Sequence, residues 1–187
     1  MNIFSFFAGA GFLDLGFELQ GDYNIVFVNE FHEAFDRIYR YARQNMGLQE
    51  PKYGHHIEDI TEYIDGEHGD RLQRLIDWVE ESKEEELTGF IGGPPCPDFS
   101  VELKQQFRAH GYSLTEQLVN SLEFGAAQDR DRIILIGFHQ DAVNRLHLQA
   151  DNGVLMNFPW EAHKRYNLKE IKNLPWPNKS PYQENTP

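Results

Sequence analysis

The stretch NIFSFFAGAGFLDLGFEL, residues 2–19, decides the fold. Residues 2–7 form a short apolar run, AGAG interrupts it, and residues 12–19 repeat apolar side chains with helical spacing. This pattern predicts a strand, a glycine turn and a helix. Glycines allow the tight backbone of such a turn and let a ligand approach it closely. An ordinary strand-to-helix turn without a ligand is the alternative.

The same plan recurs further along the chain. Residues 23–30 predict a buried strand that ends in Glu30, and residues 31–45 predict an amphipathic helix. We expect the buried face of this helix to carry Phe31, Phe35, Ile38, Tyr39 and Ala42. Residues 55–60 predict a short strand that ends near Asp59, residues 70–86 a helix, and residues 87–93 another strand.

Successive strand–helix units imply parallel strands whose carboxyl ends meet at one edge of a sheet. We therefore expect this edge to carry Gly9, Gly11, Glu30, Asp59 and Cys96. Residues 105–110 predict a helix, and residues 111–120 and 132–138 predict two strands that suit an antiparallel pair at a sheet edge. A helix near residues 141–150 precedes a tail rich in proline and tryptophan. The predicted fold class is α/β, a mostly parallel sheet with an antiparallel edge hairpin.

Length and composition limit the function classes. The 187 residues suit one domain. The 17 Lys and Arg residues against 30 Asp and Glu give a net charge of −13, which argues against a surface that grips nucleic acid throughout and makes any DNA contact local. We recognise neither a membrane span nor a signal peptide and expect a cytoplasmic protein.

The single cysteine, Cys96, lies in GGPPCPDFS, residues 92–100. Pro95 and Pro97 restrict the backbone on both sides of the thiol. A nucleophile benefits from such a clamp, because attack geometry tolerates little error. A buried small apolar residue is the alternative. One cysteine is too few for an internal disulfide or for a cysteine-rich zinc site.

Four charged residues have two interpretations each. Glu30 suits ribose hydroxyls, or it stabilises the first turn of the next helix. Asp59 suits an adenine amino group, or it caps a helix that begins near Thr61. Arg130 and Arg132 have the period-two spacing that places both on one face of a strand, where they reach into the crevice or form surface ion pairs.

The segments FFAGAGFLDLGFE, VNEF, EDI, GGPPCPDFS and NSLEFGAAQDRDRIILIGF occur in the order, and mostly at the spacing, of the DNA (cytosine-5) methyltransferases. Residues 1–138 resemble this family. The resemblance implies a Rossmann-like, S-adenosylmethionine-binding catalytic core over residues 1–138, followed by a helix and a Pro/Trp segment over 139–187 that leads toward an absent target-recognition region. It also implies methyl transfer to C5 of a cytosine flipped out of double-stranded DNA, with S-adenosylhomocysteine as product. Restriction–modification is one setting of such enzymes, and no metal or membrane is implied.

The resemblance also assigns site residues. The cofactor-binding residues would be Phe7, Ala8, Gly9, Gly11, Phe12, Glu30, Phe31, Asp59, Ile60 and Pro95. In this set Glu30 would hold the ribose hydroxyls and Phe31 would stack near the adenine. Asp59 and Ile60 would recognise the adenine. Cys96 would add to cytosine C6, while Arg130 and Arg132 would orient the base. The sequence departs from the family pattern at Phe12, where many members have glycine, and at the two residues after Cys96.

Two parts of the family pattern are missing. A Glu-Asn-Val strand, whose acid lies near cytosine N3, is absent between Ser100 and the arginine motif, and the recognition region and last motif are absent after the FPW…LP segment. Without that acid, addition to C6 lacks a proton donor. The chain is then a decayed or shortened gene product, one chain of a split enzyme completed by a second chain, or part of a longer enzyme.

Two other functions follow from the same residues. A non-catalytic S-adenosylmethionine-binding or partner module is the alternative to the enzyme. An NAD-type oxidoreductase is disfavoured, because FAGAGF departs from the G-x-G-x-x-G spacing.

Overall fold

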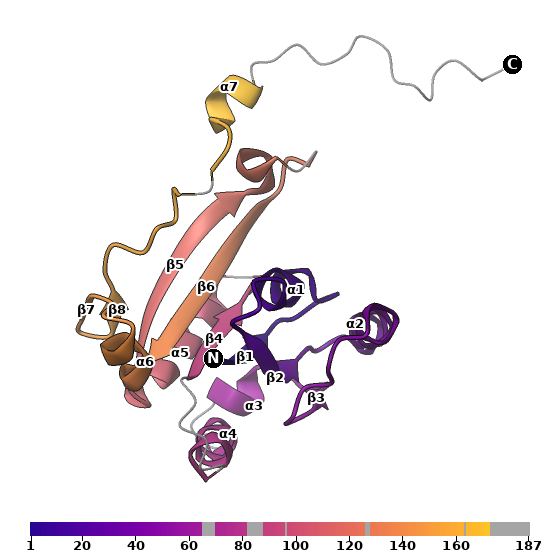
Figure 1. Ribbon diagram of the computed structural model, residues 1–187, viewed down its shortest axis with the longest axis vertical. Coiled ribbons are helices and arrows are strands. Elements are labelled where there is room, and N and C mark those ends of the chain that lie inside the picture. Colours follow the sequence, from indigo (N-terminus) through magenta and orange to yellow (C-terminus); the bar gives the residue numbers. More distant parts are fainter. Residues whose placement is uncertain (65–69, 82–87, 96, 126–127, 163, 173–187) are drawn as a thin grey trace, which may run out of the picture. The chain divides into compact units, whose positions relative to one another are not determined.

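The structure is a computed structural model that describes residues 1–64, 70–81, 88–95, 97–125, 128–162 and 164–172 (Figure 1). Its elements are, in chain order, β1 (Asn2–Phe6), α1 (Phe12–Glu18), β2 (Asn24–Asn29), α2 (Glu33–Met46), β3 (His55–His56), α3 (Thr61–Ile64), α4 (Asp70–Glu81), β4 (Thr88–Gly92), α5 (Pro97–Ala109), β5 (Tyr112–Asn120), the 3₁₀ helix η1 (Ser121–Phe124), β6 (Asp131–His139), α6 (Gln140–Arg145), β7 (Ala150–Asp151), β8 (Val154–Leu155) and α7 (Leu168–Lys172).

The chain divides into two compact units. Unit 1 comprises Met1–Leu118 and Arg132–Phe158, and unit 2 comprises Val119–Asp131 and Pro159–Pro187. Unit 1 therefore holds most of the sheet and the helices packed on it. The boundary that the sequence suggests at residue 138 stays a prediction.

The described strands form one sheet in the order β3-β2-β1-β4-β6-β5-β8-β7. Strand β1 is parallel to β2 on one side and to β4 on the other, with Asn2 aligned to Asn24 and to Thr88. All five residues of β1 are buried, as expected for a strand with neighbours on both edges and helices on both faces. The predicted α/β fold class is confirmed.

The other half of the sheet contains antiparallel pairs. Strand β6 runs antiparallel to β4, with Gly89 opposite Phe138 and Gly92 opposite Leu135. Figure 1 shows β5 and β6 running in opposite directions, as predicted for a hairpin. The short strands β8 and β7 follow β5 in the sheet, and the amide of Leu114 donates to the carbonyl of Gly153 at 3.1 Å.

Several elements differ in extent from their predictions. Strand β3 covers only two residues, because the chain turns near Asp59 into α3. Helix α5 begins at Pro97, well before the predicted residue 105, since proline is tolerated in a first helical turn. The helix predicted near residues 141–150 ends at Arg145 and is followed by β7. Residues 82–87, at the end of another predicted helix and the start of the next strand, lie outside the described residues.

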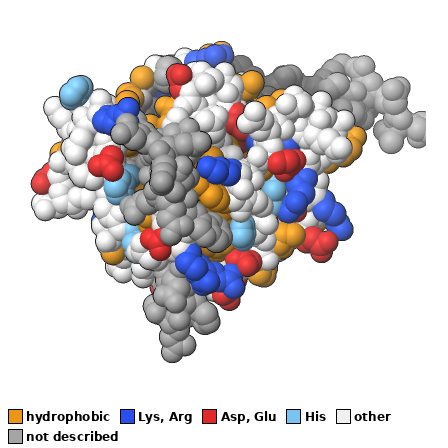
Figure 2. Space-filling model, turned by 60° about the horizontal axis from the view of Figure 1, so that its bottom comes forward, with side chains coloured by type: hydrophobic (Ala, Val, Ile, Leu, Met, Phe, Trp, Pro, Cys, Tyr) orange, Lys and Arg blue, Asp and Glu red, His pale blue; other side chains and the backbone are white. Residues whose placement is uncertain are grey.

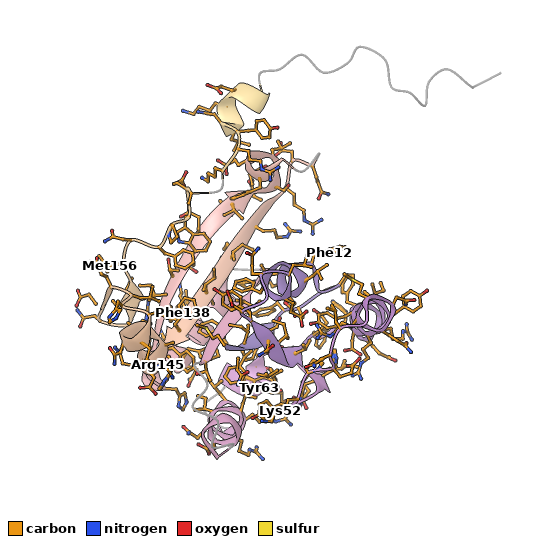
Figure 3. All side chains as sticks on the ribbon, in the orientation of Figure 1. Phe12, Lys52, Tyr63, Phe138, Arg145 and Met156 are labelled. Atoms are coloured by element: carbon orange, nitrogen blue, oxygen red, sulfur yellow. The ribbon has the colours of Figure 1, made fainter. Side chains whose placement is uncertain are left out.

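The face of the sheet covered by α3, α4 and α5 is filled with aromatic rings; we call it the aromatic face. Its largest buried strand residues are Phe4, Phe6, Phe27 and Phe90. Phe107 of α5 stacks on Phe90 with ring centroids 3.7 Å apart. Tyr63 of α3, labelled in Figure 3, makes edge contacts with two of these rings at 5.7 Å.

The opposite face, covered by α1 and α2, is packed differently; we call it the polar face. The prediction for α2 was partly wrong: Phe35 and Ile38 are 46% and 52% exposed, although Tyr39 is buried as expected. Asp36 and Arg43 share the buried side of the helix with Tyr39. The helix turns polar side chains inward because the neighbouring elements offer buried polar partners, which are described below.

On the face shown in Figure 2, acidic and basic side chains of the described residues lie interspersed. Within the described part of the chain, no helix combines the length and the apolar character needed to span a bilayer.

Candidate functional site

Two loops and the beginning of β6 meet at the edge formed by the carboxyl ends of β1 and β4. A Cβ atom placed on Gly92, the last residue of β4, would lie 3.7 Å from Cδ2 of Phe7 in the turn after β1. A Cβ on Gly93 would lie 3.9 Å from the carbonyl oxygen of Ile133 in β6. The glycine turn, the segment that leads to Cys96 and the amino end of β6 are therefore neighbours.

Glu30 connects the glycine turn to the end of β2. Its carboxylate accepts a hydrogen bond from the amide of Gly9 at 2.8 Å and from the amide of His32 at 2.9 Å, and it is almost fully buried. The bond to His32, directly before α2, agrees with the helix-start interpretation. The bond to Gly9 brings together two residues that the sequence placed at one edge.

The backbone of the glycine turn requires its glycines. Gly9 has φ 57° and Gly11 has φ 85°, in the left-handed region, and Phe7 also lies there with φ 54°. A Cβ atom on Gly11 would lie 2.6 Å from the ring of Tyr39, so a side chain does not fit. A Cβ on Gly9 would meet no described atom within 4 Å. The turn is therefore packed on one side at Gly11 and open at Gly9.

Two aromatic rings next to this turn are exposed. Phe31, directly after Glu30, is 59% exposed, and Phe12, the first residue of α1, is 82% exposed (Figure 3). Ala8 is buried, and its amide donates to the carbonyl of Asn29 at 3.1 Å. Exposed rings beside a buried carboxylate can contact a planar ligand.

Asp59 and Ile60 lie at the beginning of α3. Asp59 Oδ1 accepts hydrogen bonds from the amide and the hydroxyl of Thr61, both at 2.9 Å, which is the capping role that the sequence allowed. The side chain of Ile60 is buried in the aromatic face and does not point to solvent. A contact between Ile60 and a ligand would therefore involve its backbone.

The structure describes the residues on either side of the predicted nucleophile but not the nucleophile itself. Pro95 is exposed, and Cys96 lies outside the described residues. Arg132, the second residue of β6, belongs to unit 1 and is exposed. It directly precedes Ile133, whose carbonyl lies near Gly93. Arg130 belongs to unit 2 and is also exposed.

Unit 2 holds the segment around Arg130 in a compact loop. The side-chain amide of Asn120 donates to Asp129 and to Asp131, both at 2.7 Å, and the carbonyl of Arg130 accepts from the amide of Ser121 at 3.1 Å. Glu123 pairs with Lys164 at 3.3 Å. Glu123 is therefore engaged in an ion pair inside unit 2.

A buried polar network next to the glycine turn was missed by the sequence analysis. Asp14 of α1 is 1% exposed and accepts hydrogen bonds from Ser5 and from Tyr39, both at 2.7 Å. Arg43 donates to the Tyr39 oxygen at 3.3 Å and binds both carboxylate oxygens of Glu18 at 2.7 and 2.8 Å. Burial raises the pKa of Asp14 to about 6. The signal in the sequence was the polar set at positions 36, 39 and 43, which has helical spacing.

The sequence of this chain is similar to those of known proteins. The profile of the family described as C-5 cytosine-specific DNA methylase matches residues 1–106 and 101–186. The Type II methyltransferase M.NmeDI of Neisseria meningitidis serogroup C is 36% identical in an alignment 211 residues long, which covers 86% of this chain and 47% of the relative. M.MthTI of Methanothermobacter thermautotrophicus is 25% identical, over 95% of this chain and 58% of its own length.

The solved structure of the S. pombe Dnmt2 methyltransferase has a TM-score of 0.42 and 13% identity, over 78% of this chain and 53% of that one. The chain spans about half the length of the curated relatives it matches. The family profile and the identity to M.NmeDI both extend over most of the chain, and they show that it belongs to the C-5 cytosine-specific DNA methylase family.

Proposed function

We propose that this chain is the S-adenosylmethionine-binding core of a DNA (cytosine-5) methyltransferase. The observation that carries the proposal is the 2.8 Å hydrogen bond from Gly9 to Glu30, within a chain of this family. It joins a glycine turn to an acid at the end of the next parallel strand, where open α/β sheets bind their ligands.

The residues at this edge fit the methyl donor. Each carboxylate oxygen of Glu30 accepts one backbone hydrogen bond and has a further lone pair for a ribose hydroxyl. The open side of Gly9 leaves room for the backbone to approach a ligand. The exposed ring of Phe31 is suited to stack on adenine. When bound, S-adenosylmethionine supplies an electrophilic methyl group.

The remaining site residues take their proposed roles from the family. Residues 7–12, with Ala8, Gly11 and Phe12, would surround the methionine part of the donor. Asp59 would accept from the adenine amino group and Ile60 would contribute its backbone, while Pro95 would hold the neighbouring thiol in place. S-adenosylhomocysteine would be the product.

The proposed reaction uses a thiolate and two arginines. Cys96 would add to C6 of a cytosine flipped out of the DNA duplex, so that C5 could take the methyl group from the sulfur of the donor; loss of the C5 proton would then expel the thiolate. Arg130 and Arg132 would hold the base. The proximity of Gly93 to Ile133, the residue after Arg132, supports this role for Arg132.

A non-catalytic donor-binding module is the second candidate. The alignment with M.NmeDI runs over 211 residues and is longer than this chain, so the relative carries segments that this chain lacks. Strand β4 has β1 on one edge and β6 on the other. An acid-bearing strand could not join β4 without displacing one of them, which favours a module without its own catalytic acid on this strand.

Transfer of labelled methyl groups from S-adenosylmethionine to mixed-sequence duplex DNA tests the proposal, with Cys96→Ala as the matched control. Label on cytosine that disappears in the variant would support methyl transfer by this chain through Cys96. If no label appears but calorimetry detects S-adenosylhomocysteine binding, the chain is the non-catalytic module. The absence of both transfer and binding would overturn both candidates.

A further inference from the structure

The buried network around Asp14 connects the two sides of the glycine turn. Ser5 lies in β1, before the turn, and Asp14 lies in α1, after it. Their 2.7 Å hydrogen bond joins residues nine positions apart, with the whole turn between them. This contact fixes where the chain leaves the strand and where it enters the helix.

Tyr39 holds the turn from a third element, α2. Its hydroxyl donates to the second oxygen of Asp14 at 2.7 Å, and its ring lies where a side chain on Gly11 would be. Arg43 donates to the Tyr39 oxygen and is itself held by both carboxylate oxygens of Glu18. The orientation of the ring against Gly11 is therefore fixed by hydrogen bonds at its far end.

The chemistry of this network is directional. Hydrogen bonds specify distances and angles, whereas apolar contacts tolerate small shifts. A buried carboxylate is also an unfavourable way to fill space, because its charged form loses solvation. An ordinary packing site would carry apolar side chains, as the opposite face of the same sheet does.

We propose that Ser5, Asp14 and Tyr39 are positioning residues that hold residues 7–11 in the shape that binds the methyl donor. They act through the turn, which the ring of Tyr39 contacts at Gly11, and do not contact the ligand themselves. The inference rests on the proposed function, because it concerns the same turn.

The test measures binding of S-adenosylhomocysteine by calorimetry at pH 7.5. Tyr39→Phe removes a hydroxyl group and Asp14→Asn removes a negative charge. Both variants keep the shape of the side chain. We expect each to weaken binding about tenfold, the size of one lost buried hydrogen bond. Because the residues form one network, the double variant with both substitutions should bind no more weakly than whichever single variant has the lower affinity.

Tyr112→Phe is the matched control. Tyr112 is also buried, and its hydroxyl bonds to that of Thr88 at 3.0 Å. Thr88 begins β4, so this contact lies at the other end of the strand from Gly92. The control removes the same chemical group, and we expect it to lower the unfolding temperature while binding stays within about twofold of wild type.

Amide hydrogen exchange without ligand provides a second measurement. We expect the amides of residues 8–11 to exchange about tenfold faster in Tyr39→Phe than in wild type, and at an unchanged rate in Tyr112→Phe. If wild type does not bind the ligand, the proposed function fails, and exchange alone decides whether the network holds the turn. Unchanged exchange, or affinity losses that follow the unfolding temperature equally in all variants, would overturn the inference.

Discussion

The aromatic face and the polar face cover the same strands but bury different chemistry. The aromatic face packs rings of Phe6, Phe90 and Phe107 against one another. The polar face buries the carboxylate of Asp14 and the guanidinium of Arg43. Burial of rings is favourable in almost any arrangement, whereas buried polar groups are tolerated only with their partners in place. The first face therefore supplies stability, and the second determines the shape of the neighbouring turn.

The largest expected effect lies on the aromatic face. Phe107 is fully buried and contacts Phe6, Phe90 and Tyr112, with ring centroids 3.7 to 5.5 Å apart. Phe107→Ala removes these contacts and leaves a cavity, so we expect the free energy of unfolding to fall by about 3–5 kcal/mol. Urea unfolding followed by circular dichroism measures it. Phe107→Leu, which fills most of the volume, should lose clearly less, and equal losses would contradict a packing role.

The polar face should make the stability of the fold depend on pH. Burial raises the pKa of Asp14 to about 6 from an ordinary 3.8, although hydrogen bonds from Tyr39 and Ser5 and the charge of Arg43 act in the opposite direction, and Glu18 adds to the rise. The pKa is raised in the folded state, so folding takes up a proton between these two values. The stabilisation of the folded state by the protonated Asp14 carboxyl is complete below about pH 3.8. It is lost as the pH rises through about 6.

The variant Asp14→Asn cannot titrate and therefore isolates this contribution. We expect its unfolding free energy, relative to wild type, to improve by roughly 2 kcal/mol between pH 4 and pH 7.5. Urea unfolding of both proteins at each pH measures the difference. A difference that does not change with pH would show that Asp14 has an ordinary pKa, and the polar face would then be no more demanding than the aromatic face.

The sequence predicted β1, β2 and β4 because each is a short apolar run bounded by turn residues, whereas it missed the two-residue strands β7 and β8. The glycine turn and Glu30 were found for the same reason, since a parallel sheet places strand ends at one edge. Their contact was then visible as the bond from Gly9. The roles of Cys96 and the two arginines stay predictions.

The sequence-based prediction failed where apolar side chains are exposed and polar side chains are buried. Tyr39 was correctly expected inside, but Phe35 and Ile38 were expected there too, because apolar residues normally form the buried side of a helix. The choice between the two sides of α2 depends on Ser5 and Asp14, which belong to other elements. Periodicity within one helix carries no information about such partners.

The smallest expected effect lies on the outer side of α2 and tests this reversal directly. Ile38 is 52% exposed and precedes Tyr39 by one residue. Ile38→Gln should change the free energy of unfolding by no more than about 0.5 kcal/mol, as for other surface positions. Thermal and urea unfolding measure it, with Tyr39→Phe on the inner side for comparison. A loss of about 2 kcal/mol would instead be typical of a core position, and the apolar stripe would then face inward as periodicity alone suggests.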